Sequence, residues 1–491
     1  MKLEALLHHV PTLGVEGPLD REVTSIAYDS RRVKPGSVYV ALKGEKADGS
    51  AFIGNAINAG AVAVVSETGQ PFSSATSIVV AAPRETLADL AANFYQHPAR
   101  HLKIAGVTGT NGKTTTAFLI KHICEHALLR CGLIGTVRYE VGDEILPAPR
   151  TTPESLELHE LLWKMRSAGC KTVAMEVSSH ALVQARVRGV EFDAAIFTNL
   201  TQDHLDYHRT MESYFEAKTL LFSRLAEQKK KGKAIINLDD RYGAMLVNRF
   251  KAEIPILTYG LGVHADFRAS NVRIDFQGTS FQLDAQGKSY LVRLPLIGNF
   301  NVYNSLAALA AACVMGVDVR AGVLSLANAA AVPGRLEPVP AQRQFRVFVD
   351  YAHTDDALLN VIRTCRELNP ARLIVVFGCG GNRDATKRPR MGAVVDAHAD
   401  LAIVTSDNPR REDPLAIIED IKGGMKRGNY EVIPDRREAI FHAVNLAAPR
   451  DIILIAGKGH ETYQEFADHT APFDDVAVAR EALEARRVDL N

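Results

Sequence analysis

Residues 108–116 carry the clearest chemical signal in this chain. They read Thr-Gly-Thr-Asn-Gly-Lys-Thr-Thr-Thr and directly follow an apolar run at 102–107. A short strand, a glycine-bracketed turn and Gly-Lys-Thr at the start of a helix are typical of a loop that holds nucleotide phosphates, because backbone N–H groups and the helix dipole both attract the anion. Lys113 can reach the outer phosphates, and the Thr114 hydroxyl can bind magnesium.

The match to the general phosphate-loop pattern is imperfect. Five residues separate Gly106 from Gly112, so the strict spacing places Val107 where a glycine belongs. A glycine-rich turn that binds no nucleotide is therefore the alternative. The preceding strand and the Gly-Lys-Thr-Thr run favour the phosphate loop.

Polar residues also collect where two further strands are predicted to end. Met-Glu-Val-Ser-Ser-His at 175–180 closes one strand, and Asn-Leu-Thr-Gln-Asp-His-Leu-Asp-Tyr-His at 199–208 closes the next. Open α/β sheets bind their ligands at the carboxyl ends of strands. We therefore interpret Glu176 and His204 as candidate magnesium ligands, although either residue alone is more simply a capped loop residue.

The composition restricts the class of protein. The chain has 491 residues, 47% hydrophobic and 23% charged, which is typical of a globular protein of two to four domains. Lys plus Arg and Asp plus Glu number 57 each, so no global charge favours nucleic acid or an anionic membrane. The six cysteines form no Cys-x-x-Cys pair, which favours a reducing compartment. With no signal peptide and no stretch of roughly 20 apolar residues, we expect a cytoplasmic protein without membrane insertion.

The order of apolar runs predicts an α/β protein of three domains. Residues 1–100 read as a small α/β domain. Residues 101–333 repeat a β-α-β pattern, which predicts a central domain of the phosphate-loop type with a mostly parallel sheet and an antiparallel patch. After a hinge at 331–335, residues 334–491 predict a Rossmann-like domain.

These expectations rest on individual segments. We predict helices at 52–59, 85–95 and 302–315. We predict strands at 37–42, 61–66, 77–81, 103–107, 172–177, 194–198, 234–237, 272–276, 280–284, 290–294, 346–350, 373–377, 401–405 and 451–456.

Five motifs together resemble the Mur ligases, the ATP-dependent amide-bond ligases of peptidoglycan precursor synthesis. They are Thr-Gly-Thr-Asn-Gly-Lys-Thr-Thr at 108–115, Met-Glu-Val-Ser-Ser-His at 175–180, Asp-His-Leu-Asp-Tyr-His at 203–208, Asp-Tyr-Ala-His-Thr at 350–354 and Gly-Lys-Gly-His-Glu at 457–461. The motifs follow the family's order and span essentially the whole chain. The resemblance implies a ligase of cell wall biogenesis, with consequences for cell shape and cell division.

Within the family, the chain most resembles the members that add meso-diaminopimelate to UDP-N-acetylmuramoyl-L-alanyl-D-glutamate. The resemblance implies that a substrate carboxylate attacks the γ-phosphoryl group of ATP, and that the incoming amine then displaces phosphate from the acyl phosphate. Such a step brings two anions together, so it depends on positioning and charge neutralisation. We expect small-molecule substrates, no nucleic-acid partner and a monomer.

The resemblance assigns roles around ATP and Mg²⁺. In this family the lysine at the position of Lys218 carries a carbamate formed with CO₂, whereas alone it reads as an exposed helix lysine. A carbamate supplies the oxygens that magnesium prefers and that an amine lacks. For Asn301 and Asn304, which the resemblance places beside the adenine, ordinary helix capping is the alternative. The implied catalytic residues are Lys113, Glu176, His204 and Lys218; the metal ligands are Thr114, Glu176, His204 and carbamylated Lys218; and the ATP contacts are Gly109, Thr110, Asn111, Gly112, Lys113, Thr114, Thr115, Asn301, Asn304, Arg335 and Asp350.

The resemblance also assigns the two remaining substrates. Hydroxyl, amide and guanidinium groups suit the phosphate and carboxylate oxygens of the UDP precursor. The implied precursor-binding residues are Ser30, Glu45, Lys46, Ala47, Thr151, Thr152, Ser178, Gln184 and Arg186. The implied diaminopimelate-binding residues are Arg388, Asp407, Asn408, Pro409, Arg410, Gly457 and Glu461.

Asp-Asn-Pro-Arg at 407–410 marks the diaminopimelate-adding members, and lysine-adding relatives lack this arginine. Diaminopimelate is lysine with a second carboxylate, which a guanidinium binds through two parallel hydrogen bonds. We expect lysine to leave Arg410 buried without a partner, at a cost of roughly 3–5 kcal/mol. The alternative is a surface ion pair of Arg410 beside Glu412 and Asp413.

Three residues depart from the family pattern. Asp355 replaces a usual proline, which predicts a looser turn, Asn382 replaces a frequent aspartate, and Arg150 precedes Thr-Thr-Pro where another residue type is common. The alternatives to the leading hypothesis are a lysine-adding ligase, a folylpolyglutamate-type ligase and an NTP-dependent switch without ligase chemistry.

Overall fold

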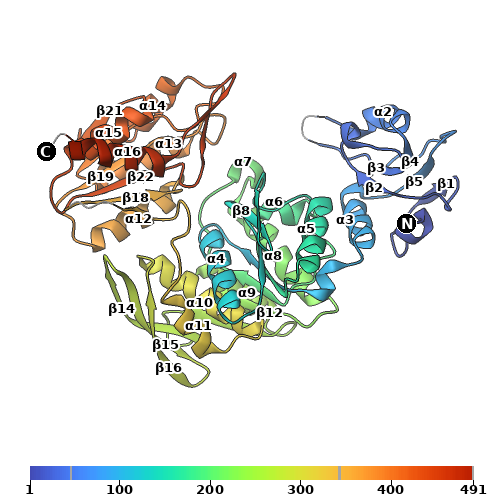
Figure 1. Cartoon of the computed structure of the whole chain (residues 1–491), viewed down its shortest axis with the longest axis horizontal. Coiled ribbons are helices and arrows are strands. Elements are labelled where there is room, and N and C mark those ends of the chain that lie inside the picture. Colours follow the sequence, from blue (N-terminus) through green and yellow to red (C-terminus); the bar gives the residue numbers. More distant parts are fainter. Residues whose placement is uncertain (45–46, 341–343, 489–491) are drawn as a thin grey trace.

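The computed structural model describes residues 1–44, 47–340 and 344–488, and these form three α/β bodies (Figure 1). Each body contains its own sheet, and no strand pairing joins two of these sheets within the described residues. The predicted fold class is confirmed. The exact domain boundaries at 100 and 333 stay a prediction, although the three large sheets fall on either side of them.

The N-terminal body is a five-stranded sheet in the order β1-β5-β4-β3-β2. Neighbouring strands from β2 to β5 run parallel, and β1 is antiparallel to β5. Helix α3, with a proline in its first turn, leads the chain towards the central body. The elements are α1 (Leu3–Leu6), β1 (Gly14–Glu16), β2 (Ser25–Ala27), β3 (Ser37–Val40), α2 (Ile53–Asn58), β4 (Ala61–Ser66), β5 (Thr76–Val79) and α3 (Pro83–Phe94).

The central body is an eleven-stranded sheet in the order β16-β15-β14-β13-β12-β11-β6-β10-β7-β8-β9 among the described residues. Its middle strands are parallel, and an antiparallel segment extends each end. The strands are β6 (Lys103–Thr108), β7 (Cys131–Ile134), β8 (Arg138–Val141), β9 (Glu144–Pro147), β10 (Thr172–Glu176), β11 (Ala194–Phe197), β12 (Lys233–Asn237), β13 (Ile256–Gly260), β14 (Phe267–Asp275), β15 (Gly278–Ala285) and β16 (Lys288–Leu294). The helices are α4 (Lys113–His126), α5 (Ser155–Ser167), α6 (Ser179–Val183), α7 (Leu205–His208), α8 (Met211–Glu227), α9 (Arg241–Phe250), α10 (Asn299–Val314) and α11 (Val319–Leu326).

Both faces of the central sheet are buried. Along β6, Ala105 and Val107 pack into the core formed with α4, α10 and α11, whereas Ile104 packs into the opposite core with α5 and α8. Because successive side chains of a strand point to opposite faces, a strand covered on both sides reads as one apolar run. This explains why the parallel strands β6, β10, β11 and β12 were predictable from hydrophobicity alone.

The strand order brings the candidate loops together. The four neighbouring strands β11, β6, β10 and β7 are mutually parallel, so their carboxyl ends meet at one edge of the sheet. The phosphate loop follows β6, the 177–180 segment follows β10 and the 198–208 segment follows β11. The fold therefore gathers motifs that lie up to 100 residues apart in sequence.

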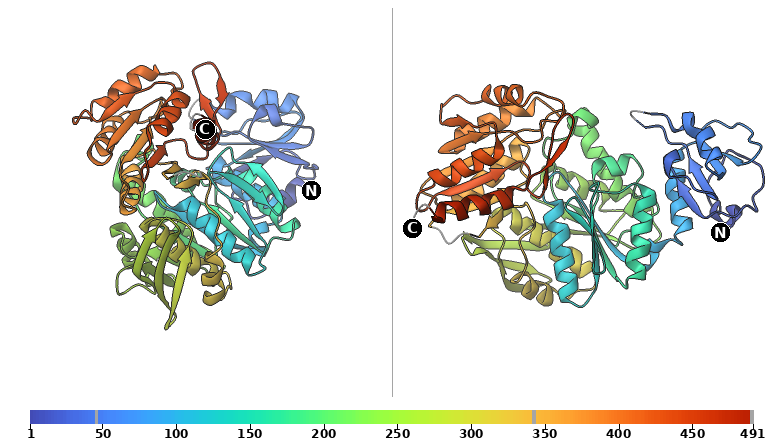
Figure 2. Two further views of the ribbon diagram at one scale, coloured as in Figure 1. Left: turned by 60° about the vertical axis from the view of Figure 1, so that its left-hand side comes forward. Right: turned by 45° about the horizontal axis from the view of Figure 1, so that its top comes forward.

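The C-terminal body is a six-stranded sheet in the order β17-β18-β22-β19-β20-β21, with helices on both faces (Figure 2). Strands β18 to β22 run parallel, and β17 is antiparallel to β18. The elements are β17 (Glu337–Val339), β18 (Arg346–Asp350), α12 (Asp355–Glu367), β19 (Leu373–Phe377), α13 (Lys387–His398), β20 (Leu401–Val404), α14 (Pro414–Lys422), β21 (Tyr430–Val432), α15 (Arg436–Leu446), β22 (Ile452–Ala456), β23 (Tyr463–Glu465), β24 (Thr470–Pro472) and α16 (Asp475–Val488). A separate β23–β24 hairpin follows β22.

Several elements differ from the sequence expectations. Among the described residues, ten strands were not predicted, namely β1, β2, β7, β8, β9, β13, β17, β21, β23 and β24. Helix α10 begins at Asn299 rather than at 302. The predicted antiparallel patch is present as β14, β15 and β16, and it continues the central sheet through β13, as expected. The turn at Asp355 is not loosened, because Thr354 caps α12 by accepting a hydrogen bond from the Ala357 amide.

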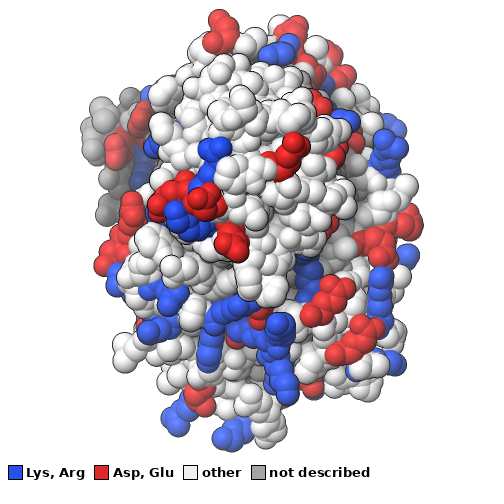
Figure 3. All heavy atoms as spheres, turned by 90° about the vertical axis from the view of Figure 1, so that its right-hand side faces the viewer, with Lys and Arg blue, Asp and Glu red and all other residues white. Residues whose placement is uncertain are grey.

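The surface carries charges of both signs. On the face seen in Figure 3, acidic and basic side chains are interspersed, and basic side chains gather in its lower half. This distribution agrees with the equal numbers of acidic and basic residues. In the described part of the chain, no helix combines the length and the apolar character needed to cross a membrane.

Candidate active site

The phosphate loop is built on two glycines with left-handed backbone. Gly109 has φ 145° and Gly112 has φ 86°. A Cβ atom on Gly109 would lie 1.8 Å from Thr198 Oγ1, and one on Gly112 would lie 2.4 Å from Asn304 Oδ1. Val107 is a buried residue of β6, so the turn starts at Gly109 and the strict glycine spacing is not used. The imperfect spacing therefore reflects a loop that begins later.

Two lysine amines meet at one carbonyl of this loop. Lys218 Nζ donates to Gly109 O at 2.8 Å, and Lys113 Nζ donates to the same oxygen at 3.0 Å and to Thr110 O at 2.7 Å. Burial lowers the pKa of Lys113, and it lowers the pKa of Lys218 well below its usual value, with a further contribution from the charge of Lys113. Lys218 is 1% exposed, so the expectation of an exposed helix lysine is wrong.

Helix α8 explains the position of Lys218. Tyr214 lies one turn earlier on the same face, and its ring lies 4.5 Å from Lys218 Nζ. The Tyr214 hydroxyl lies 3.3 Å from Thr110 Oγ1, and its ring stacks on His208. The lysine is therefore held between an aromatic ring and the phosphate loop.

Glu176 and His204 lie at the ends of the two strands that flank β6, but they differ in their surroundings. Glu176 is 1% exposed and accepts hydrogen bonds from the Thr136 amide at 2.8 Å and the Thr136 hydroxyl at 3.1 Å. His204 has a left-handed φ of 54°, and its Nε2 lies 3.4 Å from Asp203 Oδ2. Within the described residues, no three His, Cys, Asp or Glu side chains are grouped as a metal site. Unmodified Lys218 therefore leaves the predicted metal site short of oxygen ligands.

A cavity of about 400 Å³ opens above the phosphate loop. Its lining unites most of the predicted ATP and metal residues, namely Thr110, Asn111, Gly112, Lys113, Thr114, Thr115, Glu176, His204, Lys218, Asn304, Arg335 and Asp350. Gly109 is not among the lining residues, but its carbonyl accepts from two that are, Lys113 and Lys218. Asn301 is not brought to this cavity, because its side-chain amide donates to Ile297 O at 2.9 Å and it lines a separate cavity at the hinge. Helix capping does not describe Asn301 either, because α10 has Gly298 at its N-cap and no side-chain capping hydrogen bond.

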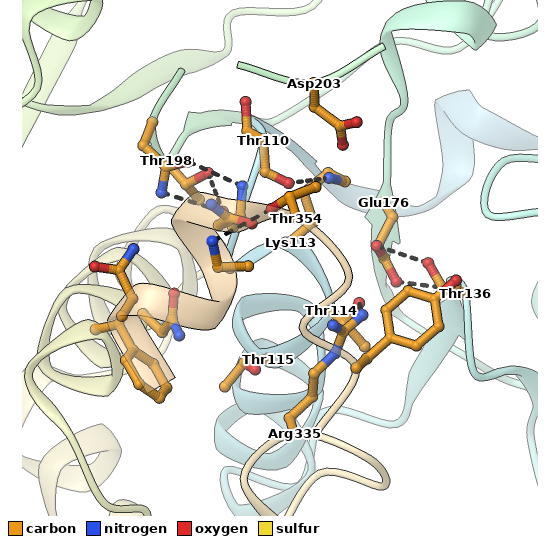
Figure 4. A pocket seen from close by; sticks show the side chains of 18 of the residues that line it. Thr110, Lys113, Thr114, Thr115, Thr136, Glu176, Thr198, Asp203, Arg335 and Thr354 are labelled. Atoms are coloured by element: carbon orange, nitrogen blue, oxygen red, sulfur yellow. Dashed lines mark hydrogen bonds between the residues drawn. The ribbon is translucent and has the colours of Figure 1, made fainter. Parts of the chain in front are cut away.

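Arg335, from the hinge, contacts the phosphate loop, and Asp350, from the C-terminal body, lines the same cavity. Arg335 donates to the Thr114 hydroxyl at 3.1 Å, as Figure 4 shows, and its guanidinium lies 4.7 Å from the Tyr351 ring. Asp350 accepts the amides of Leu336 and Ala352 at 2.6 and 2.7 Å, and burial raises the pKa of its carboxyl group. The cavity predicted to hold ATP is therefore lined by two bodies of the molecule.

The predicted precursor residues form two separate groups. Thr152 Oγ1 donates to Glu176 O at 2.8 Å, and Arg186 donates to Thr152 O and Gln184 Oε1 at 3.0 and 2.6 Å. Thr151 and Ser178 line the phosphate cavity itself. The other group lies in the N-terminal body. Ser30 starts a short 3₁₀ turn, the Ala47 carbonyl accepts a hydrogen bond from the Gly44 amide, and neither residue lines this cavity. Glu45 and Lys46 lie outside the described residues.

A second cavity, of about 650 Å³, lies between the central and C-terminal bodies. Its lining includes the predicted diaminopimelate residues Asp407, Asn408, Arg410, Gly457 and Glu461. Asn408 donates to Glu461 at 2.8 Å, and the fully buried Lys458 donates to both Asn408 and Glu461, at 3.0 and 3.1 Å. These contacts join the loop after β20 to the loop after β22.

Two expectations about this cavity need correction. Arg388 is 3% exposed and pairs with Glu412 and Asp420 at 2.8 and 2.9 Å, so its guanidinium is already occupied. Neither Arg388 nor Pro409 lines the cavity. Arg410 does not pair with Glu412 or Asp413, and it is not left unpartnered, because Glu465 accepts from its Nε at 2.8 Å. The predicted cost of binding lysine is therefore too high.

The two cavities share a wall. Residues that line both of them are Thr136, Thr151, Asp203, His204, Tyr351, His353 and Thr354. His353 Nδ1 donates to Tyr351 O at 2.8 Å, and burial lowers the pKa of His353 to about 4. A group bound at the phosphate loop can therefore face a group bound in the second cavity.

Sequence reasoning missed several of these residues. Thr136, which holds Glu176, follows β7, and this strand was not predicted. Asn111 Nδ2 donates to Asp356 Oδ2 at 3.0 Å across the two bodies, a contact that no local pattern indicates. Asp203 and His353 lie inside quoted motifs, so their position at strand ends was an available signal.

Comparisons with known proteins agree with this architecture. Family models described as "Mur ligase family, catalytic domain", "Mur ligase middle domain" and "Mur ligase, glutamate ligase domain" match residues 22–95, 107–312 and 334–459. A UDP-N-acetylmuramoyl-L-alanyl-D-glutamate–2,6-diaminopimelate ligase of Syntrophomonas wolfei is 45% identical over 99% of this chain and 100% of its own length. A ligase of the same name from Halalkalibacterium halodurans is 47% identical over 95% of each chain. A solved structure of a ligase of this name is 35% identical and covers 99% of each chain with a TM-score of 0.72. The chain belongs to the Mur ligase family.

Proposed function

We propose that this chain is an ATP-dependent, ADP-forming ligase that adds meso-diaminopimelate to UDP-N-acetylmuramoyl-L-alanyl-D-glutamate in peptidoglycan precursor synthesis. Full-length relatives bear this name. The observation that carries the proposal is the shared wall, since it lets a carboxylate activated beside the phosphate loop face an amine in the second cavity. We also propose that the ligase acts in the cytoplasm.

The reaction divides between the two cavities. A substrate carboxylate attacks the γ-phosphorus of ATP and ADP leaves; the amine then attacks the acyl carbon, phosphate leaves and the amine loses a proton. Lys113 and the loop amides stabilise the phosphate oxygens, and Arg335 adds a second cation from the hinge. Asp407, Asn408 and Glu461 orient the amino acid, and Arg410 binds its distal carboxylate.

Magnesium fits the residues at the phosphate cavity. Thr114, Glu176, His204 and a carbamate on Lys218 would hold it, and the ion would neutralise charge between the attacking carboxylate and the γ-phosphate. The buried amine of Lys218 supports the carbamate, because only a neutral amine forms an N–C bond with CO₂, releasing one proton. Carbon-13 NMR of the enzyme in ¹³C-bicarbonate should show a carbamate signal that Lys218→Ala lacks.

Phosphate release with purified substrates tests the function. The complete mixture of ATP, UDP-precursor and meso-diaminopimelate should release phosphate rapidly, and mixtures lacking the precursor or the amine should not. Lysine should support a slower reaction. Equal rates with lysine would assign a lysine-adding ligase, and ATP turnover indifferent to both partners would assign a switch. Lys229→Ala, which changes an exposed lysine, is the control and should behave as the unmodified chain does.

A further inference from the structure

Arg410 is held in an unusual backbone conformation. Its φ is 54°, the left-handed region that costs a non-glycine residue free energy. Its amide donates to Glu465 O at 3.0 Å, and it forms a parallel bridge opposite Phe466. The β23–β24 hairpin, which carries Glu465, therefore fixes the backbone from which the Arg410 side chain extends.

The guanidinium of Arg410 is fixed at two of its three nitrogens. Nε donates to Glu465 Oε2 at 2.8 Å, and Nη1 donates to Gly381 O at 2.8 Å. In the described part of the chain, no hydrogen bond is recorded for Nη2. The free donors are thus on the Nη edge of the group, which can bind both oxygens of a carboxylate.

Glu465 is not itself part of the cavity wall. Arg410 lines the second cavity, whereas the described lining does not include Glu465. The Glu465 amide also donates to Asn408 Oδ1 at 3.0 Å, which ties the hairpin to the Asp-Asn-Pro-Arg loop. Any effect of Glu465 on the amino acid is therefore expected to pass through Arg410.

We propose that Glu465 is a positioning residue that sets the preference for an amine bearing a distal carboxylate. This inference rests on the function proposed above. Glu465 orients the guanidinium so that its Nη edge faces the cavity, and its negative charge keeps Arg410 paired when no carboxylate is bound. Selectivity then comes from attraction of the correct amine more than from rejection of lysine.

Four variants test this role: Glu465→Ala, Glu465→Gln, Arg410→Ala and the Glu465→Ala/Arg410→Ala double variant. With ATP and precursor saturating, Glu465→Ala should raise the KM for diaminopimelate about 5–10-fold with little change in kcat, as expected for a loosened charge-assisted contact. The slow reaction with lysine and the KM for ATP should not change. Glu465→Gln, which keeps an acceptor oxygen, should restore most of the affinity.

The double variant separates positioning from direct contact. In the Arg410→Ala background, Glu465→Ala should add nothing further. A persistent loss there would show that Glu465 contacts the amino acid itself, and an unchanged or lowered KM in the single variant would also overturn the proposal. Glu481→Ala is the matched control, because it removes a similarly exposed glutamate paired with Arg437 away from the cavity. If the unmodified enzyme shows no dependence on diaminopimelate, the proposed function fails instead.

Discussion

The phosphate loop and the interior of the C-terminal body treat buried cations in opposite ways. At the phosphate loop, the amines of Lys113 and Lys218 share the carbonyl of Gly109, and burial lowers the pKa of both. In the C-terminal body, Arg388, Arg436 and Lys458 each pair with a carboxylate within 3.1 Å. A cation without a carboxylate is suited to receive an anionic ligand, whereas a paired cation is suited to hold the protein together.

Arg436 shows the second kind most clearly. It and Asp475 form an ion pair that is 0% exposed on both sides. The remaining donors of Arg436 reach Ser406 O at 3.3 Å and Ala456 O at 3.0 Å, the residues just before the two loops that line the second cavity. The pair therefore anchors the ends of both loops.

The largest expected effect is the loss of ligase activity when Lys218, an amine without a carboxylate partner among the described residues, is removed. Lys218→Ala should lower ligation by at least about 10³-fold, a loss comparable with removing a group aimed at developing charge. A short carboxylic acid that fills the gap should restore part of the rate. Near-normal turnover without the acid would break the comparison, because Lys218 would then have no role towards the anions.

Removing the amine of Lys218 should not lower the thermal stability of the protein. Lys218→Met keeps an apolar chain of similar length and removes an amine that burial disfavours, so its thermal midpoint should equal or exceed that of the unmodified chain. Differential scanning calorimetry measures this. A clear drop in the midpoint would place Lys218 with the structural cations instead.

The next effect is a loss of stability when the buried ion pair of Arg436 and Asp475 is broken. Arg436→Met leaves Asp475 buried without a partner and should cost about 3–5 kcal/mol in the urea unfolding of the C-terminal body. Arg436→Met/Asp475→Leu should recover most of that loss. Arg437→Met, the next residue along α15, removes an exposed pair with Glu481 and should cost less than about 1 kcal/mol. Equal losses for the two single variants would contradict the assignment.

A smaller effect concerns the choice of amine. Arg410→Ala should reduce kcat/KM for diaminopimelate about 10–100-fold, the range expected for hydrogen bonds between charged groups. The KM for ATP should stay within about twofold, because Arg410 does not line the phosphate cavity. Steady-state kinetics with each substrate varied in turn checks this, and a large loss of ATP affinity would mean that this loop serves the nucleotide.

The smallest expected effect is on the pH dependence of stability, at a buried histidine that lines neither cavity. His159 is 0% exposed, and burial lowers its pKa to about 4 from 6.5. As the pH falls from 6.5 to about 4, the unfolded chain takes up a proton that the folded chain refuses, so stability declines. When the pH is lowered from 7 to 5, the free energy of unfolding of His159→Gln should fall by about 1–2 kcal/mol less than that of the unmodified chain. Parallel pH profiles in urea titrations would contradict the shift.

Much of the fold could be predicted because its central strands are buried on both faces. Strands β4, β18 and β19 match their predicted ranges residue for residue. The missed strands β8 and β9 belong to an antiparallel edge, where Glu144, Ile145 and Pro147 are exposed and no continuous apolar run exists. Edge pairing depends on neighbours rather than on local hydrophobicity.

The site divides in the same way. Lys113, Glu176 and His204 could be chosen from the sequence because strand order places their loops at one edge. The pairing of Arg410 with Glu465 spans 55 residues and arises from a hairpin outside the parallel sheet. No local pattern indicates it, so the charge on Arg410 was predicted but its partner was not.

The seven residues common to both cavities also bear on how ATP is spent. An acyl phosphate is prone to hydrolysis, so each one that escapes into bulk water wastes a nucleotide. Because the two cavities share these lining residues, the proposed reaction would let the amine meet the acyl phosphate beside the place where it forms. Such proximity favours close to one amide bond per nucleotide consumed.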